Sequence, residues 1–238
     1  MRKNAIILLP TYKEIDNIKE MLIALKHNSH LYDLLVIDDN SPDGTGLVVQ
    51  DFMRENSWVT LLTRGSKEGL GAAYKDGILY ALGKKYSEVI TMDCDFSHDP
   101  SVIPVMLESH AGNDLTLGSR YITGGSIENW SPMRRALSKW GNIYYNLMTG
   151  AKVKDLTTGF RVYSSKALAG LDIESLGSKG YAFQAEMVMG IKSNKGSIYE
   201  FPIKFTDRER GTSKMSLKIT IESFLLAHKF LIRRVLKG

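Results

Sequence analysis

The chain has 238 residues, of which 43% are hydrophobic and 24% are charged, and its formal net charge is +5. This composition is that of a globular protein, and it excludes low-complexity and collagen-like chains. We expect no signal peptide and no membrane span, because no apolar run reaches the roughly 18 residues that a span needs. Cys94 is the only cysteine, which excludes an intrachain disulfide and indicates a reducing compartment.

The first half of the chain alternates apolar runs of strand length with helical patterns. Strands are expected over 5–9, 34–37, 59–63 and 89–92, and helices over about 14–27, over about 45–56 and from near 72. This order is typical of an α/β fold with a doubly wound sheet. The loop after the first strand, Pro10-Thr11-Tyr12-Lys13-Glu14, lacks the Gly-x-Gly-x-x-Gly pattern of dinucleotide-binding folds.

The second half continues the alternation. We expect a helix near 101–111, a strand over 115–121, a loop over 122–133, a helix from 134 to about 148, a turn into a strand over 155–163, a helix from 180, and a strand over 198–205. Pro202 predicts that this last strand lies at a sheet edge. A basic loop over 207–214 contains Gly211 and is expected to close over a bound diphosphate.

The chain divides at about residue 215. Residues 1–215 form the expected α/β domain, and 216–238 read as a basic amphipathic helix. Such a helix is typical of a membrane-surface element, and we favour that interpretation over a terminal helix that packs on the core.

Two carboxylates, Asp93 and Asp95, follow the strand that ends near Met92. In extended backbone, residues two apart point to the same side, so both acids can approach one hard cation. Carboxylates suit Mg²⁺ or Mn²⁺, and ligands of open α/β sheets bind at the carboxyl ends of strands. We therefore predict a metal-diphosphate site here, although an isolated Asp-x-Asp pair is more often a solvated turn.

Other polar groups have both a functional and a structural interpretation. Asp38 and Asp39 either bind a ribose or base, or cap the next helix. In the loop over 65–71 we expect the glycines to allow close packing, and a place for Lys67 near a phosphate is the less favoured interpretation. Arg134 and Arg135 open a helix, where cations oppose the dipole, so they either receive an anion or are simply solvated.

Several motifs then occur in order: Pro10-Thr11-Tyr12-x-Glu14, Asp38-Asp39-x-Ser41-Pro42-Asp43-Gly44-Thr45, Met92-Asp93-x-Asp95 and Gly118-Ser119-Arg120-Tyr121. Together they resemble inverting family 2 glycosyltransferases with the GT-A fold, a mostly parallel, Rossmann-like sheet flanked by helices. Later segments are similar to dolichyl-phosphate (polyprenyl-phosphate) mannosyltransferases: Leu156-Thr157-Thr158-Gly159-Phe160-Arg161, Ser178-Lys179-Gly180-Tyr181-x-Phe183-Gln184-x-Glu186-Met187 and Arg208-x-x-Gly211-x-Ser213-Lys214. The resemblance covers about residues 5–220.

The resemblance implies a GDP-mannose donor, a polyprenyl monophosphate acceptor and Mg²⁺ or Mn²⁺. It assigns the nucleoside to Pro10, Tyr12, Glu14, Ile37 and Asp39, and the diphosphate with its metal to Asp93, Cys94 and Asp95. It gives Arg208 and Lys214 the role of clamping the diphosphate, and it assigns the acceptor phosphate to Arg120, Arg134 and Ser138. The catalytic residues that it implies are Asp93, Asp95, Arg120 and Arg134.

The chain departs from the family pattern at two positions. Cys94 stands where alanine is common, and we expect it to be tolerated because mainly its backbone faces the donor. Ser97 stands where some relatives have glutamine as a metal ligand. Asp95 and Ser97 are the expected metal ligands. Because serine is shorter than glutamine, we expect Ser97 to bind the metal weakly or through water.

The resemblance also implies the partners and the place of action. It implies peripheral attachment to the cytoplasmic face of a membrane, with a small anchoring protein as an optional partner and no nucleic acid. Alternative functions are a polyprenyl-phosphate glucosyltransferase that uses UDP-glucose, or another family 2 enzyme. A nucleotidyltransferase would carry a glycine-rich loop directly after the first strand, which this chain lacks, and the set of acids and arginines argues against a non-catalytic membrane-surface module.

Overall fold

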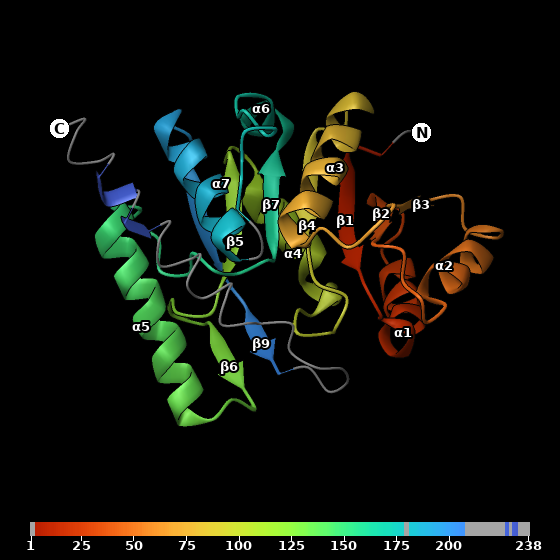
Figure 1. Cartoon of the computed structure of the whole chain (residues 1–238), viewed down its shortest axis with the longest axis horizontal. Helices are drawn as coiled ribbons and strands as arrows, with labels where there is room; N and C mark the ends of the chain where they lie inside the picture. The colour runs from red at the N-terminus through yellow and green to blue at the C-terminus, as the bar shows by residue number, and fades with distance from the viewer. Residues whose placement is uncertain (1–2, 179–180, 208–226, 229, 233–238) are drawn as a thin grey trace.

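The computed structural model describes residues 3–178, 181–207, 227–228 and 230–232. Its centre is a seven-stranded sheet with the order β3-β2-β1-β4-β7-β5-β8 (Figure 1). The strands are β1 (Ala5–Thr11), β2 (Tyr32–Asp38), β3 (Val59–Thr63), β4 (Glu88–Thr91), β5 (Leu115–Ser119), β7 (Arg161–Ser164) and β8 (Ile198–Pro202). Only β7 runs antiparallel to its neighbours, so the sheet is mostly parallel, as predicted.

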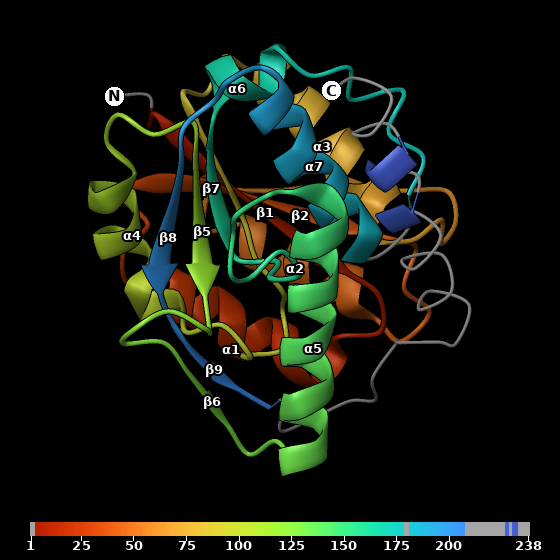
Figure 2. The same cartoon turned by 90° about the vertical axis from the view of Figure 1, so that its left-hand side faces the viewer.

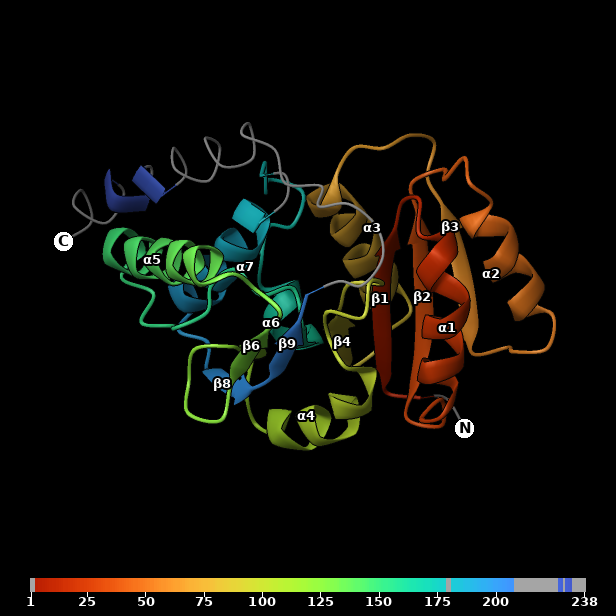
Figure 3. The same cartoon turned by 90° about the horizontal axis from the view of Figure 1, so that it is seen from below.

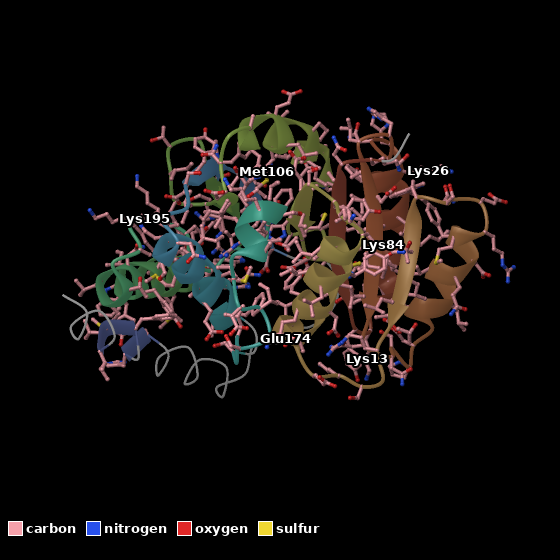
Figure 4. The ribbon with its side chains drawn as sticks, turned by 90° about the horizontal axis from the view of Figure 1, so that it is seen from above. Lys13, Lys26, Lys84, Met106, Glu174 and Lys195 are labelled. Carbon is pink, nitrogen blue, oxygen red and sulfur yellow. The ribbon has the colours of Figure 1, made fainter. Side chains whose placement is uncertain are left out.

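Helices cover both faces of the sheet. They are α1 (Ile15–Lys26), α2 (Thr45–Met53), α3 (Leu70–Gly83), α4 (Ile103–His110), α5 (Pro132–Thr149), α6 (Ser165–Ala169) and α7 (Tyr181–Ser193), with a 3₁₀ turn over Pro100–Val102. Figure 4 labels Met106 of α4 and Glu174, which lies between α6 and α7, on opposite sides of the sheet. The α/β class with helices on both faces is therefore confirmed.

The central strands β1, β2 and β4 supply the core on both faces, because successive side chains point to opposite sides. In β1, Ile6 and Leu8 pack with α3 and α7, whereas Ile7 and Leu9 pack with α1 and α4. Burial on both faces explains why these strands read in the sequence as continuous apolar runs rather than as alternating patterns.

A second, two-stranded sheet lies beyond the ends of β5 and β8. It pairs β6 (Ser126–Glu128) with β9 (Lys204–Thr206), and α5 stands beside it (Figure 2). The expected loop over 122–133 therefore contains a short strand. The expected strand over 198–205 is divided at Ile203, where the chain changes partner: its N–H donates to Ser119 of β5 at 3.1 Å, and its carbonyl accepts the N–H of Ser126 of β6 at 3.0 Å. The predicted edge position is confirmed, since β8 is the last strand of the large sheet.

Other boundaries also differ from expectation. Helix α5 begins at Pro132 rather than at 134, because the Ser131 hydroxyl caps it by accepting the N–H of Arg134. Strand β5 ends at Ser119 because the N–H of Arg120 turns away to the carboxylate of Asp155. Helix α2 ends at Met53, and helix α6 was not predicted.

The expected basic loop and amphipathic helix fall mainly on residues 208–226 and 233–238, outside the described residues. At the described positions, Ala227 is buried and His228 lies against Tyr144 of α5. No helix in the described ranges has the length and apolarity needed to cross a membrane.

Candidate active site

The residues predicted to hold the nucleoside gather at the carboxyl ends of β1 and β2. Pro10 and Ile37 are register partners of these parallel strands. Tyr12 follows directly after β1, and the N–H of Asp39 donates to the Thr11 carbonyl at 3.0 Å. The sheet pairing itself thus brings together residues that are far apart in the sequence, at the edge where such sheets bind ligands.

Asp39 is held by an arginine that the sequence did not single out. The Arg64 guanidinium, directly after β3, donates to Asp39 at 2.6 Å, to Asp76 of α3 at 2.7 Å and to Glu68 at 3.1 Å. Burial raises the pKa of Asp39, although the Arg64 hydrogen bond and charge oppose the shift. One oxygen of Asp39 is therefore fixed on Arg64, which orients the carboxylate.

Asp38 plays a structural part. Its carboxylate accepts the hydroxyl of Thr11 and both the N–H and hydroxyl of Ser41, so it holds the turn after β2. It does not cap α2, where the Asp43 carboxylate accepts the N–H of Thr45 instead. The capping alternative is therefore wrong for Asp38.

Glu14 and Tyr12 lie beside this turn. The Glu14 carboxylate accepts a hydrogen bond from the side-chain amide of Asn17, and the backbone N–H of Glu14 donates to the Thr45 hydroxyl. The ammonium of Lys67 lies 4.1 Å from the centroid of the Tyr12 ring, a cation–π contact. Lys67, which we considered near a phosphate, thus lies on a predicted nucleoside residue.

The acidic loop follows β4. Ser97 donates its hydroxyl to Asp95 Oδ1 at 2.6 Å and its N–H to the same oxygen at 3.1 Å. Phe96 between them has φ of 59°, a left-handed conformation that is uncommon for a bulky residue and typical of functional turns. Asp95 and Ser97 are buried, Asp93 is about one-third exposed at 34%, and Cys94 is buried.

This loop suits a divalent ion with further ligands from a substrate. Carboxylate and hydroxyl oxygens are the hard ligands that Mg²⁺ and Mn²⁺ prefer. Over the described ranges, no three His, Cys, Asp or Glu side chains lie together as a metal cluster. An ion held by Asp95 would thus depend on oxygens from a bound diphosphate or water, which is how Mg²⁺ commonly binds.

His98 packs behind the acidic loop. Its Nδ1 accepts the N–H of Asp93 at 3.4 Å, and its ring stacks on Phe160 with centroids 5.2 Å apart. Burial lowers the pKa of His98 to about 4, so the ring is neutral at pH 7. This supporting contact was not predictable from the residue pattern, because a histidine after Asp-x-Asp has no fixed role.

The predicted acceptor residues come from the end of β5 and from α5. Figure 3 shows α5 with the small sheet on one side of β4 and the strands β1, β2 and β3 on the other. Arg120 donates to both carboxylate oxygens of Asp155 at 2.7 Å and to the Thr157 hydroxyl at 2.8 Å. Its side chain is only 7% exposed. The charge of Arg120 is therefore balanced by Asp155. Burial alone would raise the pKa of Asp155, but the charge and hydrogen bonds of Arg120 hold that pKa below its usual range.

Arg134 is more open. It donates to Asp207 at 2.6 Å, and its side chain is 42% exposed. Its guanidinium lies 4.1 Å from the ring centroid of Trp130, and that of Arg120 lies 5.6 Å from the same ring. The third predicted acceptor residue, Ser138, accepts the Tyr121 hydroxyl at 2.7 Å. The structure thus brings Arg120 and Arg134 to one tryptophan, while Arg208 and Lys214 lie outside the described residues.

The sequence did not single out Trp130, Asp155 or Asp207. Asp155 follows no strand, and its partner Arg120 is 35 residues away. Of the residues that were missed, only Arg64 could have been proposed from the sequence as a site residue, because it directly follows β3 at the edge that carries the other polar residues.

Comparison with known proteins identifies the family to which this chain belongs. The model of the glycosyl transferase family 2 matches residues 6–171, which run from the second residue of β1 through β7 and include most of the residues above. The chain belongs to glycosyl transferase family 2. Among curated proteins, the chain is similar to a polyprenol monophosphomannose synthase of Mycolicibacterium smegmatis, with 38% identity over 216 residues, which are 90% of this chain and 82% of the relative. An undecaprenyl-phosphate mannosyltransferase of Micrococcus luteus is 39% identical over 88% of this chain and 86% of the relative.

Solved structures of other glycosyltransferases share the fold. The Mycobacterium tuberculosis glucosyl-3-phosphoglycerate synthase in complex with Mn²⁺, UDP and glucosyl-3-phosphoglycerate has a TM-score of 0.64 at 14% identity, over 99% of this chain and 79% of that one. A Pyrobaculum calidifontis mannosyltransferase in complex with GDP-Man and Mn²⁺ has a TM-score of 0.59 at 14% identity, over 100% of this chain and 76% of that one. The expected GT-A architecture is therefore confirmed for this family 2 glycosyltransferase.

Proposed function

We propose that the protein transfers mannose from GDP-mannose to a polyprenyl monophosphate, with inversion at the anomeric carbon, to give polyprenyl-phosphate mannose. The observation that carries the proposal is the likeness, at 38% and 39% identity over about nine-tenths of the chain, to a polyprenol monophosphomannose synthase and an undecaprenyl-phosphate mannosyltransferase. The arrangement of acids after β4 and arginines beside Trp130 supports it, because the reaction joins two phosphate-bearing substrates.

The donor side requires charge to be stabilised on a leaving nucleoside diphosphate. A divalent ion held by Asp95, with Ser97 nearby, would supply that stabilisation when bound. Tyr12 and Asp39 would hold the nucleoside, with Arg64 fixing the Asp39 carboxylate. We assign the clamp on the diphosphate to Arg208 and Lys214.

The acceptor side requires positioning more than proton removal. A phosphate monoester has a second pKa of about 6, so it is already largely dianionic at neutral pH. We therefore propose no dedicated general base. Arg134 orients the phosphate for attack on the face of the sugar opposite to the diphosphate, and guanidinium groups suit this because they bind phosphate oxygens in pairs.

We propose that the protein works at a membrane surface and that α5 faces the lipid. Five large apolar side chains recur along α5 at helical spacing and are 56–84% exposed: Met133, Leu137, Trp140, Ile143 and Leu147. Arg134, Arg135 and Lys139 lie on the same helix. An apolar stripe flanked by cations is typical of helices that lie in the interface of an anionic bilayer, and the lipid acceptor would be presented there.

The test is transfer itself. The protein is incubated with Mg²⁺ or Mn²⁺, radiolabelled GDP-mannose and a short polyprenyl phosphate, and the organic phase is examined for labelled product. We expect product that disappears on addition of a chelator and in Asp95→Ala. A parallel reaction with labelled UDP-glucose separates the donors: product from UDP-glucose alone would overturn the mannosyl assignment. Full activity of either substrate pair in chelator would contradict the metal role of Asp95.

A further inference from the structure

Trp130 lies between β6 and α5 and contacts two of the three predicted acceptor residues. The guanidinium of Arg134 lies 4.1 Å from its ring centroid, and that of Arg120 lies 5.6 Å away. Phe205 of β9 packs edge-on against the indole at 5.4 Å. The indole therefore contacts both guanidinium groups and packs most closely on that of Arg134.

The indole N–H of Trp130 is buried, and within the described part of the chain it has no hydrogen-bond acceptor. Indole nitrogen is a donor only, and a buried donor without an acceptor destabilises a fold by about 1–3 kcal/mol. Such groups in a folded protein call for an explanation, of which a bound ligand or an ordered water are the usual ones. With two guanidinium groups on the same ring, the ligand that suits this donor is an anion.

A carboxylate stands where an anionic ligand would bind Arg134. Asp207 accepts from Arg134 at 2.6 Å, and the two side chains are 27% and 42% exposed. An ion pair at this exposure contributes only about 0–1 kcal/mol. A phosphate dianion offers more charge and more acceptor oxygens to a guanidinium, so it can displace this carboxylate.

We propose that Trp130 is a further acceptor-binding residue: its ring positions Arg134, and its indole N–H donates to the acceptor phosphate when that phosphate replaces the Asp207 carboxylate on Arg134. This inference rests on the proposed function, because it concerns the phosphate of the lipid acceptor. Arg120 is held by Asp155 and stays in place, so the exchange takes place between Asp207 and the phosphate on Arg134.

The direct test observes the three tryptophan indole N–H groups by nitrogen-15 NMR of the whole chain. The resonances are assigned with the variants W58F, W130F and W140F. Titration with a short, soluble polyprenyl phosphate should move the Trp130 proton resonance downfield, as expected when a phosphate oxygen accepts its hydrogen bond. The signal of Trp58, which packs on Tyr32 and Phe52 away from the site, should stay in place.

Kinetics provide the second readout. W130F keeps an aromatic ring but removes the indole N–H. It should raise the KM for the lipid acceptor about tenfold, as expected for the loss of a hydrogen bond to a charged group. Its donor KM should change by less than about twofold, and W58F should change neither constant by more. Asp207→Asn should lower the acceptor KM, because it weakens the competing ion pair.

The outcomes separate this inference from the proposed function. Suppose that the acceptor saturates the protein and is mannosylated while the Trp130 resonance stays in place. The indole N–H then donates to water alone, and the inference fails. A W130F enzyme with an unchanged acceptor KM would overturn it as well. If wild-type protein forms no lipid product and no resonance responds to the acceptor, the proposed function fails, and this inference fails with it.

Discussion

Arg120 and Asp155 form a buried ion pair in which Nε donates to Oδ2 and Nη2 donates to Oδ1, each at 2.7 Å. The backbone N–H of Arg120 reaches the same carboxylate at 3.0 Å, and Glu200 accepts the N–H of Asp155 at 3.2 Å. Together these contacts tie the end of β5 to the loop before β7 and to the edge strand β8. Arg120 therefore stabilises the acceptor side of the fold in addition to the role in phosphate binding that we predict for it.

Asp155→Ala should destabilise the protein strongly, because it leaves the Arg120 charge buried without a partner. Removing one member of a buried pair typically costs about 3–5 kcal/mol, and urea unfolding of the variant measures it. The control is Asp51→Ala, which breaks a pair with Arg54 whose side chains are 71% and 80% exposed. That variant should lose less than about 1 kcal/mol, and equal losses in both variants would refute a structural role for Asp155.

Arg134→Ala should instead impair activity and leave the fold intact. Loss of the guanidinium should lower turnover with the lipid acceptor by about a hundredfold or more, because positioning and charge neutralisation of the phosphate are lost together. Binding of the donor, followed by calorimetry with GDP, should be nearly unchanged. Arg135→Ala is the matched control for a soluble acceptor, since this neighbour is exposed and is assigned to neither the donor nor the acceptor phosphate. A parallel loss of donor binding in Arg134→Ala would count against the acceptor assignment.

Much of the donor side was predictable because it depends on local patterns and one rule of sheet architecture. Continuous apolar runs identified β1, β2 and β4, and parallel strands present their carboxyl ends at one edge. These patterns predicted that polar residues after β1, β2 and β4 share one edge of the sheet, whereas the family resemblance supplied the assignment of Pro10, Ile37 and Asp95 to the donor. Helical spacing predicted α1, and a further strand-length run predicted β3, each to within two residues of the observed bounds.

The acceptor side was less predictable because its contacts join segments that are distant in the sequence. Arg134 meets Asp207 across 73 residues, and Arg120 meets Asp155 across 35. Nothing in the residue pattern of either partner specifies the other. The strand β6 was missed since three residues between glycines and a proline carry no periodic signal. The exposed face of α5 was missed because apolar residues at helical spacing read as a core-facing helix.

The apolar stripe of α5 predicts binding to lipid vesicles. Replacing Leu137, which is 73% exposed, by Glu places a negative charge in the stripe and should weaken sedimentation with vesicles that contain anionic lipid. Activity with a short soluble acceptor should be retained, since the change lies on the solvent side of the helix. The control is Ile23→Glu, an equivalent change at a residue of α1 that is 57% exposed. If both variants sediment equally, α5 does not face the membrane.

His110 predicts how stability depends on pH. The side chain is buried at the end of α4, where its Nδ1 lies 3.0 Å from the Thr116 hydroxyl. Burial lowers the pKa of His110 below its usual 6.5, although the nearby Asp114 charge opposes the shift. Between the folded and unfolded pKa values the unfolded chain therefore binds more protons than the native one. It follows that stability falls as the pH is lowered through this window.

His110→Gln should remove this contribution. The free energy of unfolding is measured in urea at several pH values between 7 and 5. It should fall less steeply with decreasing pH in the variant than in wild type, and the two slopes should differ by up to about 1.4 kcal/mol per pH unit. The slope is the informative quantity, because the substitution also changes packing and therefore the absolute stability. His30→Gln alters an exposed histidine and should leave the slope as it is. Identical slopes in the two variants would mean that His110 binds its proton equally well in the folded and unfolded chain.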